Sequence, residues 1–307
     1  MSEIAYVFPG QGAQRVGMGL DLYNESPAAR STFQQADEAL GFSLSRLCFE
    51  GPADTLKQTV NAQPAVFVVS LACLAAAKDS LGDDFPAPYR VAGHSLGEYT
   101  ALVAGGALNL TEGVRLVRER GRLMQQAGEK QPGGMTAVLG ADFDVLEAVC
   151  RETGVEIANI NCPGQIVISG AKQELDQAAQ LGLARGCKRF MPLEVSGAFH
   201  SRWMVPAYQG LARAVESCRI DPLKVPLVAN VTAREISGPA EVRQELLAQL
   251  SGCVRWQNSV EHMLSCGVST FVEMGPGQVL AGLVKRTSKE ARTLNIGSAA
   301  DVKNWKL

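Results

Sequence analysis

Short apolar runs alternate with segments of helical periodicity along most of the chain. Residues 4–8 read Ile-Ala-Tyr-Val-Phe, a run typical of a buried strand, and end abruptly at Pro9-Gly10-Gln11-Gly12. Residues 64–78 are apolar nearly all round, which predicts a core helix that Pro64 opens. This alternation predicts an α/β architecture. Helices are expected at residues 27–40, 64–78, 98–104 and 111–127, and strands at residues 4–8, 90–92, 225–230 and 270–273.

The pattern changes to short elements between residues 133 and 194. The order of the predicted elements is strand, helix, strand, strand, helix, strand, which is the order of a ferredoxin-like fold. We therefore expect a small subdomain inserted into the main sheet. Its strands are expected at residues 135–139, 155–160, 165–169 and 188–193, and its helices at residues 143–152 and 173–183.

Composition excludes several classes of protein. The 307 residues are 46% hydrophobic and 20% charged, enough for a full core. The net charge of −2, without a block of Lys or Arg, argues against a nucleic-acid partner. The longest nearly apolar stretch, residues 65–77, is shorter than the roughly 20 residues that cross a bilayer. The chain also begins Met-Ser-Glu rather than with a basic leader, so we expect a cytoplasmic protein without a membrane partner.

Cysteines and histidines limit the chemistry. The eight cysteines are dispersed singly, without a metal-ligand spacing, which predicts reduced thiols and no metal site. Only three histidines are available as a general base. His94 is expected to pack or to support another residue, and His262 is expected on a solvated helix face. His200 lies in an abrupt loop of small residues and is the remaining candidate.

Gly93-x-Ser95-x-Gly97 fits a nucleophile elbow, a strained turn between a strand and a helix that exposes a serine hydroxyl. A serine needs a base within reach of its hydroxyl, and the histidine count favours His200.

Arg120 falls on the buried stripe of the helix predicted at residues 111–127. A buried guanidinium requires either an internal partner or an anionic ligand, and its planar fork suits a carboxylate. The sequence leaves both roles open. The buried stripe is defined by four apolar residues that lie three or four positions from Arg120: Leu116, Val117, Leu123 and Met124.

Taken together, six motifs resemble those of the malonyl-CoA:acyl carrier protein transacylases, in consistent order over nearly the whole chain. The resemblance implies an α/β-hydrolase-like catalytic domain, residues 1–130 and 196–307, with a ferredoxin-like subdomain at residues 131–195. The motifs are Pro9-Gly10-Gln11-Gly12, Gly93-His94-Ser95-Leu96-Gly97-Glu98, Arg120-Gly121-x-x-Met124, Asn161-x-Pro163-Gly164-Gln165, Ala198-Phe199-His200-Ser201 and Gly275-Pro276-Gly277.

The resemblance also implies roles for individual residues. Ser95 would be the nucleophile and His200 the base, oriented by a backbone carbonyl near residues 254–256. The N–H groups of Gln11 and Leu96 would form the oxyanion hole. Arg120 would hold the malonyl carboxylate, with Asn161, Met124 and Phe199 lining the substrate site. Leu96 and Phe199 accompany malonyl preference in related acyltransferases, and Phe199 would crowd an α-methyl branch.

The implied reaction moves a malonyl group from malonyl-CoA to the phosphopantetheine thiol of an acidic acyl carrier protein. It needs no metal and no organic cofactor, and a monomer is expected. Basic pairs at Lys188-Arg189 and Lys285-Arg286 are candidates for carrier docking, against a plain solvated role.

Alternative functions remain at this stage. Fatty-acid synthesis is the expected pathway, but a polyketide synthase or a malonate decarboxylase would use the same site. A Ser-His thioesterase shares the elbow and the base but does not need a buried arginine. A catalytically silent scaffold or carrier-docking subunit would not need serine, histidine and arginine together.

Overall fold

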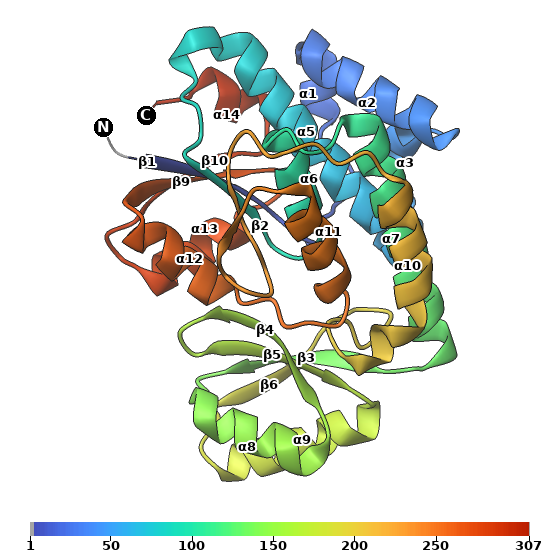
Figure 1. Cartoon of the computed structure of the whole chain (residues 1–307), viewed down its shortest axis with the longest axis vertical. Coiled ribbons are helices and arrows are strands. Elements are labelled where there is room, and N and C mark those ends of the chain that lie inside the picture. Colours follow the sequence, from blue (N-terminus) through green and yellow to red (C-terminus); the bar gives the residue numbers. More distant parts are fainter. Residues whose placement is uncertain (1–2, 307) are drawn as a thin grey trace.

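The computed structural model describes residues 3–306 and contains two sheets (Figure 1). The large sheet has the order β10-β9-β1-β2-β7-β8, and neighbouring strands are parallel except for β7 with β8. The predicted α/β architecture is confirmed. Its strands are β1 (Glu3–Phe8), β2 (Arg90–Gly93), β7 (Leu227–Val228), β8 (Glu235–Ile236), β9 (Val268–Met274) and β10 (Arg292–Ile296).

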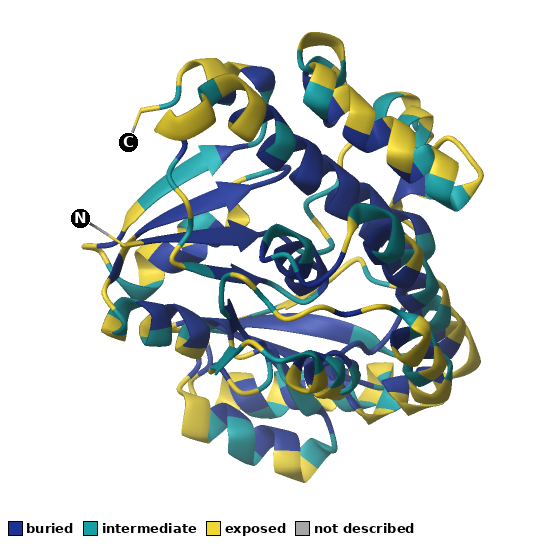
Figure 2. Ribbon diagram, turned by 45° about the horizontal axis from the view of Figure 1, so that its top comes forward, coloured by how far each residue is buried: buried dark blue, intermediate teal, exposed yellow. Residues whose placement is uncertain are grey.

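Strand β1 lies in the middle of this sheet and is buried on both faces (Figure 2). Tyr6 and Phe8 point into the larger core cluster, and Ala5 and Val7 into a second cluster on the opposite face. Alternate side chains of a strand point to opposite faces, so a continuous apolar run is what a strand between two helical layers requires.

Helices cover both faces of the large sheet. Three small ones lie between the main elements: α1 (Leu20–Glu25), α3 (Leu44–Glu50) and α4 (Ala53–Lys57). The main helices are α2 (Pro27–Leu40), α5 (Thr59–Leu81), α6 (Leu96–Ala104), α7 (Leu110–Lys130), α10 (Val205–Ser217), α11 (Pro239–Ala248), α12 (Trp256–Ser265), α13 (Val279–Thr287) and α14 (Ala299–Lys303). Two 3₁₀ turns occupy Gly82–Asp84 and Arg202–Met204.

The second sheet is fully antiparallel, with the order β4-β5-β3-β6. Two helices cover its outer face and share a core cluster of their own with it (Figure 1). This is the predicted ferredoxin-like subdomain, and its six elements are confirmed. They are β3 (Gly134–Leu139), α8 (Phe143–Thr153), β4 (Glu156–Cys162), β5 (Gln165–Gly170), α9 (Lys172–Ala184) and β6 (Arg189–Pro192).

The start predicted for the core helix was wrong. Helix α5 begins at Thr59, five residues before Pro64, which lies inside the helix. Proline lacks an N–H and leaves the carbonyl four residues earlier without its helical donor. Here Arg118 of α7 donates to that carbonyl, on Val60, at 2.7 Å. The neighbouring helix thus replaces the missing hydrogen bond, and α5 continues through the proline.

Helix α5 is also longer than the 65–77 stretch on which the argument against a membrane span rested. An 18-residue window within residues 59–84 reaches a mean hydropathy of 1.7, which by length and composition would suit a membrane-crossing helix. Within the structure, 89% of that window is buried. The helix is surrounded by the rest of the protein, as the core of an α/β fold requires (Figure 2).

The strand predicted at residues 225–230 is much shorter than expected. Only Leu227–Val228 pairs with its neighbours, because Pro226 has no N–H to donate to a ladder. At the other end, the N–H of Asn230 donates to Glu98 at 2.8 Å instead of to a strand. Asn230 thereby leaves the sheet beside the nucleophile elbow.

Candidate active site

Ser95 lies in the turn between β2 and α6, with φ 51° and ψ −106°. This is a strained conformation for a residue with a side chain, and the turn depends on two glycines. A methyl group on Gly93 would come within 1.9 Å of the backbone of Gly97, and one on Gly97 within 2.0 Å of the Phe8 carbonyl oxygen. Close packing of the turn against β1 therefore requires glycine at both positions, and the predicted elbow is present.

His200 reaches Ser95 from the loop that follows the small subdomain. Its Nε2 lies 2.7 Å from Ser95 Oγ, and its Nδ1 lies 2.9 Å from the carbonyl oxygen of Gln249. A carbonyl only accepts hydrogen bonds, so Nδ1 carries the proton and Nε2 accepts from the serine. The orienting carbonyl was expected near residues 254–256, and that expectation is wrong.

The environment of His200 keeps its ring neutral. Burial, followed by the nearby Arg120 guanidinium, lowers the pKa of His200 to about 3. Both causes disfavour an imidazolium. A neutral ring with a free Nε2 lone pair is the form that accepts a proton from a serine hydroxyl.

Arg120 is 1% exposed, as its place on the α7 stripe predicts. Its three hydrogen bonds go to uncharged oxygens: Gln63 Oε1 at 2.7 Å, Gln249 Oε1 at 2.8 Å and Ser95 Oγ at 3.1 Å. Its Nε has no partner within the described chain. A guanidinium has five N–H donors, so one Nη1 donor remains besides the buried Nε, and a ligand can also take over the Nη2 donor that Ser95 accepts. The internal acidic partner that the sequence left open is not among these contacts.

Gln249 connects the base, the arginine and the elbow. Besides orienting His200 through its carbonyl, its side chain accepts from Arg120 and donates to the Ser95 carbonyl at 2.9 Å and to Glu98. Glu98 is fully buried, and burial raises its pKa well above the usual range of a carboxyl. One residue therefore holds the nucleophile turn, the base and the anion-binding group in fixed relation.

The oxyanion hole was expected to be formed by the backbone N–H groups of Gln11 and Leu96. Gln11 follows the end of β1, its side chain donates to Thr59 at 3.2 Å, and it lines the same cavity as Ser95. Leu96 is the first residue of α6. Within the described chain neither backbone N–H donates a hydrogen bond, so both are free for a developing oxyanion.

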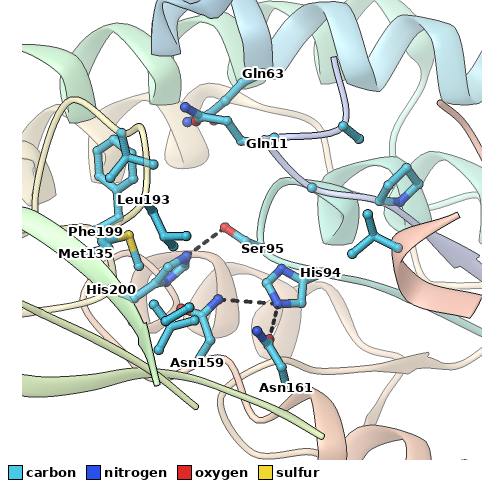
Figure 3. Close-up of a pocket in the computed structure, with 18 of the residues that line it drawn as sticks. Gln11, Gln63, His94, Ser95, Met135, Asn159, Asn161, Leu193, Phe199 and His200 are labelled. Atoms are coloured by element: carbon cyan, nitrogen blue, oxygen red, sulfur yellow. Dashed lines mark hydrogen bonds between the residues drawn. The ribbon is translucent and has the colours of Figure 1, made fainter. Parts of the chain in front are cut away.

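A cavity of about 310 Å³ opens above Ser95, between the large domain and the small sheet (Figure 3). All the predicted site side chains line it except that of Leu96, which is buried beneath the turn. Met124 contacts Gln63 through its sulfur, and Asn161 on β4 contacts the ring of His94 at 2.9 Å. The remaining side chains that the sequence predicted in the wall are Gln11, Ser95, Arg120, Phe199 and His200.

Comparison with known proteins agrees with this geometry. The model of the acyl transferase domain matches residues 5–306. The chain belongs to the acyl transferase family.

Individual acyl transferases are similar over nearly the full chain. A malonyl CoA-acyl carrier protein transacylase of Bacillus subtilis is 45% identical over 302 residues, which cover 96% of this chain and 94% of the relative. The crystal structure of an acyl-carrier-protein-S-malonyltransferase from Bartonella henselae is 40% identical, covers 98% of both chains and has a TM-score of 0.93. A malonyl-transacylase in complex with its type II PKS acyl-carrier protein is 36% identical, covers 99% of this chain and 98% of its own, and has a TM-score of 0.93. The resemblance inferred from the motifs is confirmed.

Several residues of this acyl transferase site could not be found from the sequence. Gln63 lies within the apolar helix α5, Gln249 directly follows α11, and Asn230 donates its side chain to the Gly93 carbonyl at 2.7 Å. Asn159 lies two residues before Asn161 on β4 and also lines the cavity. A single amide residue carries no local signal of its role, because only the fold brings it to the serine.

Of the two other histidines of this acyl transferase, one lies as the sequence predicts and one does not. His94 supports Asn161 and packs against Trp256 with ring centroids 5.8 Å apart, in keeping with a supporting role. His262 was expected on a solvated face, but its side chain is only 18% exposed. It meets Glu235 and Cys266, a grouping that the spacing of cysteines and histidines along the sequence does not reveal.

Proposed function

We propose that this chain transfers a malonyl group from malonyl-CoA to the phosphopantetheine thiol of an acyl carrier protein, in fatty-acid synthesis. The observation that carries the proposal is the hydrogen-bonded Ser95–His200 pair, with the buried guanidinium of Arg120 placed so that its Nη2 lies 3.1 Å from the serine oxygen. The names of the relatives support the same substrates. His200 is oriented by a carbonyl and not by a carboxylate, which distinguishes the site from the triad of a Ser-His hydrolase.

The first half-reaction acylates the enzyme. His200 Nε2 accepts the hydroxyl proton as Ser95 Oγ attacks the thioester carbon of malonyl-CoA. The N–H groups of Gln11 and Leu96 stabilise the oxyanion of the tetrahedral intermediate. The carbon–sulfur bond then breaks, His200 returns the proton to the departing CoA sulfur, and a malonyl ester remains on Ser95.

In the second half-reaction Ser95 Oγ is the leaving group, and the carrier thiol is the nucleophile. The carrier thiol gives its proton to His200 and attacks the ester carbon through the same oxyanion hole. When the ester bond breaks, His200 returns the proton to Ser95 Oγ. Every step is carried by these side chains and amides, and we propose that no metal or organic cofactor takes part.

The substrate preference follows from the cavity. A malonyl ester on Ser95 ends in a carboxylate one methylene beyond the ester carbonyl. We propose that this carboxylate accepts from the Arg120 Nη2 donor that now contacts Ser95 Oγ and from the unused Nη1 donor. Phe199 and Met124 form part of the apolar wall of the cavity, and Asn161 adds a polar group from the small sheet. We propose that Phe199 disfavours an α-methyl branch, although one methyl group is worth only about 1–3 kcal/mol.

We further propose that the chain acts as a cytoplasmic monomer. The cysteines in the described chain are all free, which suits a reducing compartment. We also propose that the catalytic domain comprises residues 1–130 and 196–307 and the subdomain residues 131–195. The connections between the two sheets lie close to these internal limits, while residues 1, 2 and 307 lie outside the described part.

The covalent intermediate provides the direct test. Incubation with malonyl-CoA, without carrier protein, is expected to add one malonyl group, which peptide mapping locates on Ser95. Intact-mass analysis of Ser95→Ala is expected to show no adduct. Ser196→Ala is the matched control, because this nearby hydroxyl bonds to Thr59 at 2.8 Å and not to the base.

An adduct on another residue, or an equal adduct on Ser95→Ala, would exclude the mechanism. The pathway is tested separately by presenting the acylated enzyme with purified carrier proteins of fatty-acid synthases, polyketide synthases and malonate decarboxylases. Faster transfer to either of the latter two than to a fatty-acid carrier would overturn the pathway and leave the chemistry intact.

A further inference from the structure

Three side chains of metal-ligating types meet at the far edge of the large sheet, outside the active-site cavity. Glu235 lies on β8, His262 in the last turn of α12, and Cys266 directly after that helix. His262 Nε2 lies 3.5 Å from Glu235 Oε1. Cys266 Sγ lies 3.6 Å from the same oxygen and 3.8 Å from His262 Nε2. The three ligand atoms thus form a nearly equilateral triangle.

The size of this triangle matches one face of a zinc tetrahedron. Zinc binds sulfur at about 2.3 Å and nitrogen or carboxylate oxygen at about 2.0–2.2 Å, which puts tetrahedral ligands roughly 3.3–3.7 Å apart. The three separations in the structure, 3.5, 3.6 and 3.8 Å, lie within a few tenths of an ångström of that range. We propose that Glu235, His262 and Cys266 bind a zinc ion, with a fourth position open to water.

Local structure holds the three ligands in place before any ion arrives. His262 and Cys266 are four residues apart at the end of a helix, where side chains of that spacing lie on one side. Glu235 is fixed by Arg90, whose Nε donates to Oε1 at 2.6 Å and whose guanidinium lies 3.8 Å from the centre of the Tyr89 ring. A carboxylate offers about four acceptor positions, so it keeps Arg90 while it binds a metal.

Exposure and charge also suit a zinc ion. The side chains of His262 and Glu235 are 18% and 30% exposed, and Cys266 is half-buried, so an ion reaches the site from solvent. On binding, the Cys266 thiol releases its proton to water and becomes a thiolate. This thiolate and the Glu235 carboxylate carry two negative charges toward the ion, while Arg90 beside Glu235 leaves the whole site with one net positive charge. The sulfur ligand favours zinc over magnesium or calcium.

Cobalt substitution tests the site directly, because a thiolate bound to Co²⁺ gives a charge-transfer band in the near ultraviolet. The full chain is titrated with Co²⁺ in a non-thiol reductant, and a band that saturates at one equivalent is expected. Zn²⁺ is expected to abolish it by displacement. Cys266→Ser is expected to lose the band, and His262→Gln to weaken Co²⁺ binding at least about tenfold.

Cys218→Ser is the matched control, because this half-buried thiol lies near Glu112 and Arg243 and away from the cluster. It is expected to keep the full band. Circular dichroism and malonyl transfer check that each variant is folded, since the cluster does not line the active-site cavity. No band at one equivalent, or a band that survives in Cys266→Ser, would overturn the zinc site; if Cys266→Ser does not fold, His262→Gln decides the question.

Discussion

Arg120 is the residue that, in the proposed mechanism, separates malonyl transfer from acyl transfer in general. Its guanidinium is buried against two amide oxygens and the nucleophile, and its Nε is without a partner in the described chain. Burial lowers its pKa, yet an arginine remains charged at neutral pH. A buried positive charge with free donors is an unfavourable arrangement unless a ligand completes it. We propose that the distal carboxylate of a malonyl group is this ligand.

Arg120→Ala is therefore expected to lose malonyl transfer and to gain relative activity on acetyl-CoA. The lost charge-assisted contact is worth about 2–5 kcal/mol in transition-state binding, which is about 30-fold to several thousand-fold in kcat/KM. Both kcat/KM values are measured with the same carrier protein. Arg122→Ala is the matched control, because Arg122 lies on the same helix and pairs with Glu119 at its surface. An unchanged malonyl-to-acetyl preference in folded Arg120→Ala would show that the arginine is only structural.

The lowered pKa of His200 determines how the rate of Ser95 acylation is expected to depend on pH. A histidine that titrates at its usual 6.5 would lose activity as the pH falls through that value, but burial and Arg120 lower the pKa of His200 to about 3. The rate of Ser95 acylation is therefore expected to stay flat from pH 8 to about pH 5. Stopped-flow measurement of CoA release in a single turnover gives this rate. A rate that falls with an apparent pKa near 6.5 would contradict the neutral, buried ring.

The same shift affects stability in a defined direction. Below pH 6.5 the unfolded chain binds a proton at this histidine and the folded chain does not, so the free energy of unfolding falls as the pH falls toward 3. Stability from this residue is fully present above pH 6.5. Thermal unfolding at each pH therefore accompanies the kinetic measurement and separates loss of folded enzyme from loss of the base.

At the scale of elements, the packing of α7 against α5 places Arg120 at the proposed anion site. Gly121 lies next to Arg120, and a methyl group at Gly121 would come within 2.8 Å of the Thr59 carbonyl oxygen. Gly113, two turns earlier, is equally close to the ring of Phe67. These two glycines let the helices approach, so that Gln63 of α5 reaches the guanidinium of Arg120. The close contact between two helices thus positions a polar pair inside an apolar interface.

Elements with strong periodicity were predictable from the sequence, and elements defined by tertiary contacts were not. The six elements of the small subdomain each carry their own apolar pattern and were found with errors of a few residues. Strand β8 has two residues, and β10 (Arg292–Ile296) reads Arg-Thr-Leu-Asn-Ile, which has too little apolar sequence to stand out. Helix α5 passes through Pro64 only because Arg118 supplies a distant donor, and no local pattern encodes that.

The residues of the site also divide into those that the sequence predicts and those that only the fold brings together. Ser95 and His200 were found because glycines and a loop of small residues mark their strained turns, where φ is 51° and 58°. The carbonyl of Gln249 was misplaced because any backbone carbonyl has the same chemistry, and only the fold decides which one reaches the ring. Glu235 and His262 were not connected for the same reason, since they come from separate elements that meet at one edge of the sheet.

At the scale of the whole molecule, the cavity lies between two domains that contribute different groups. Ser95 and Arg120 come from the large domain, and Asn161 and Met135 come from the small sheet, which lies below the large domain in Figure 1. A carrier protein must deliver its phosphopantetheine thiol into this opening. We therefore expect its docking surface to draw on both domains at the mouth of the cavity.

The two exposed basic pairs meet this requirement. Arg286 on α13 of the large domain donates to Gln165, which lines the cavity from β5. The turn before Gln165 is tied to Gly140, because the N–H of Gly140 donates to the Gly164 carbonyl at 2.7 Å, and the side chain of Lys188 packs on Gly140. Lys188-Arg189 and Lys285-Arg286 are thus linked through these contacts across the domain boundary, and we expect the carrier protein to meet both pairs.

Charge reversal at Lys188 and Arg189 is therefore expected to raise the KM for an acidic carrier protein several-fold. The dependence of this KM on salt is expected to flatten, because the attraction between exposed charges that salt screens is removed. Self-acylation by malonyl-CoA is expected to remain nearly unchanged, since the carrier takes no part in that half-reaction. The matched control reverses Arg151 and Lys172, two exposed basic residues on the helices α8 and α9 that cover the outer face of the same subdomain. Equal impairment of both half-reactions would instead indicate CoA binding or folding, and no effect on either would return the basic pairs to a purely solvated role.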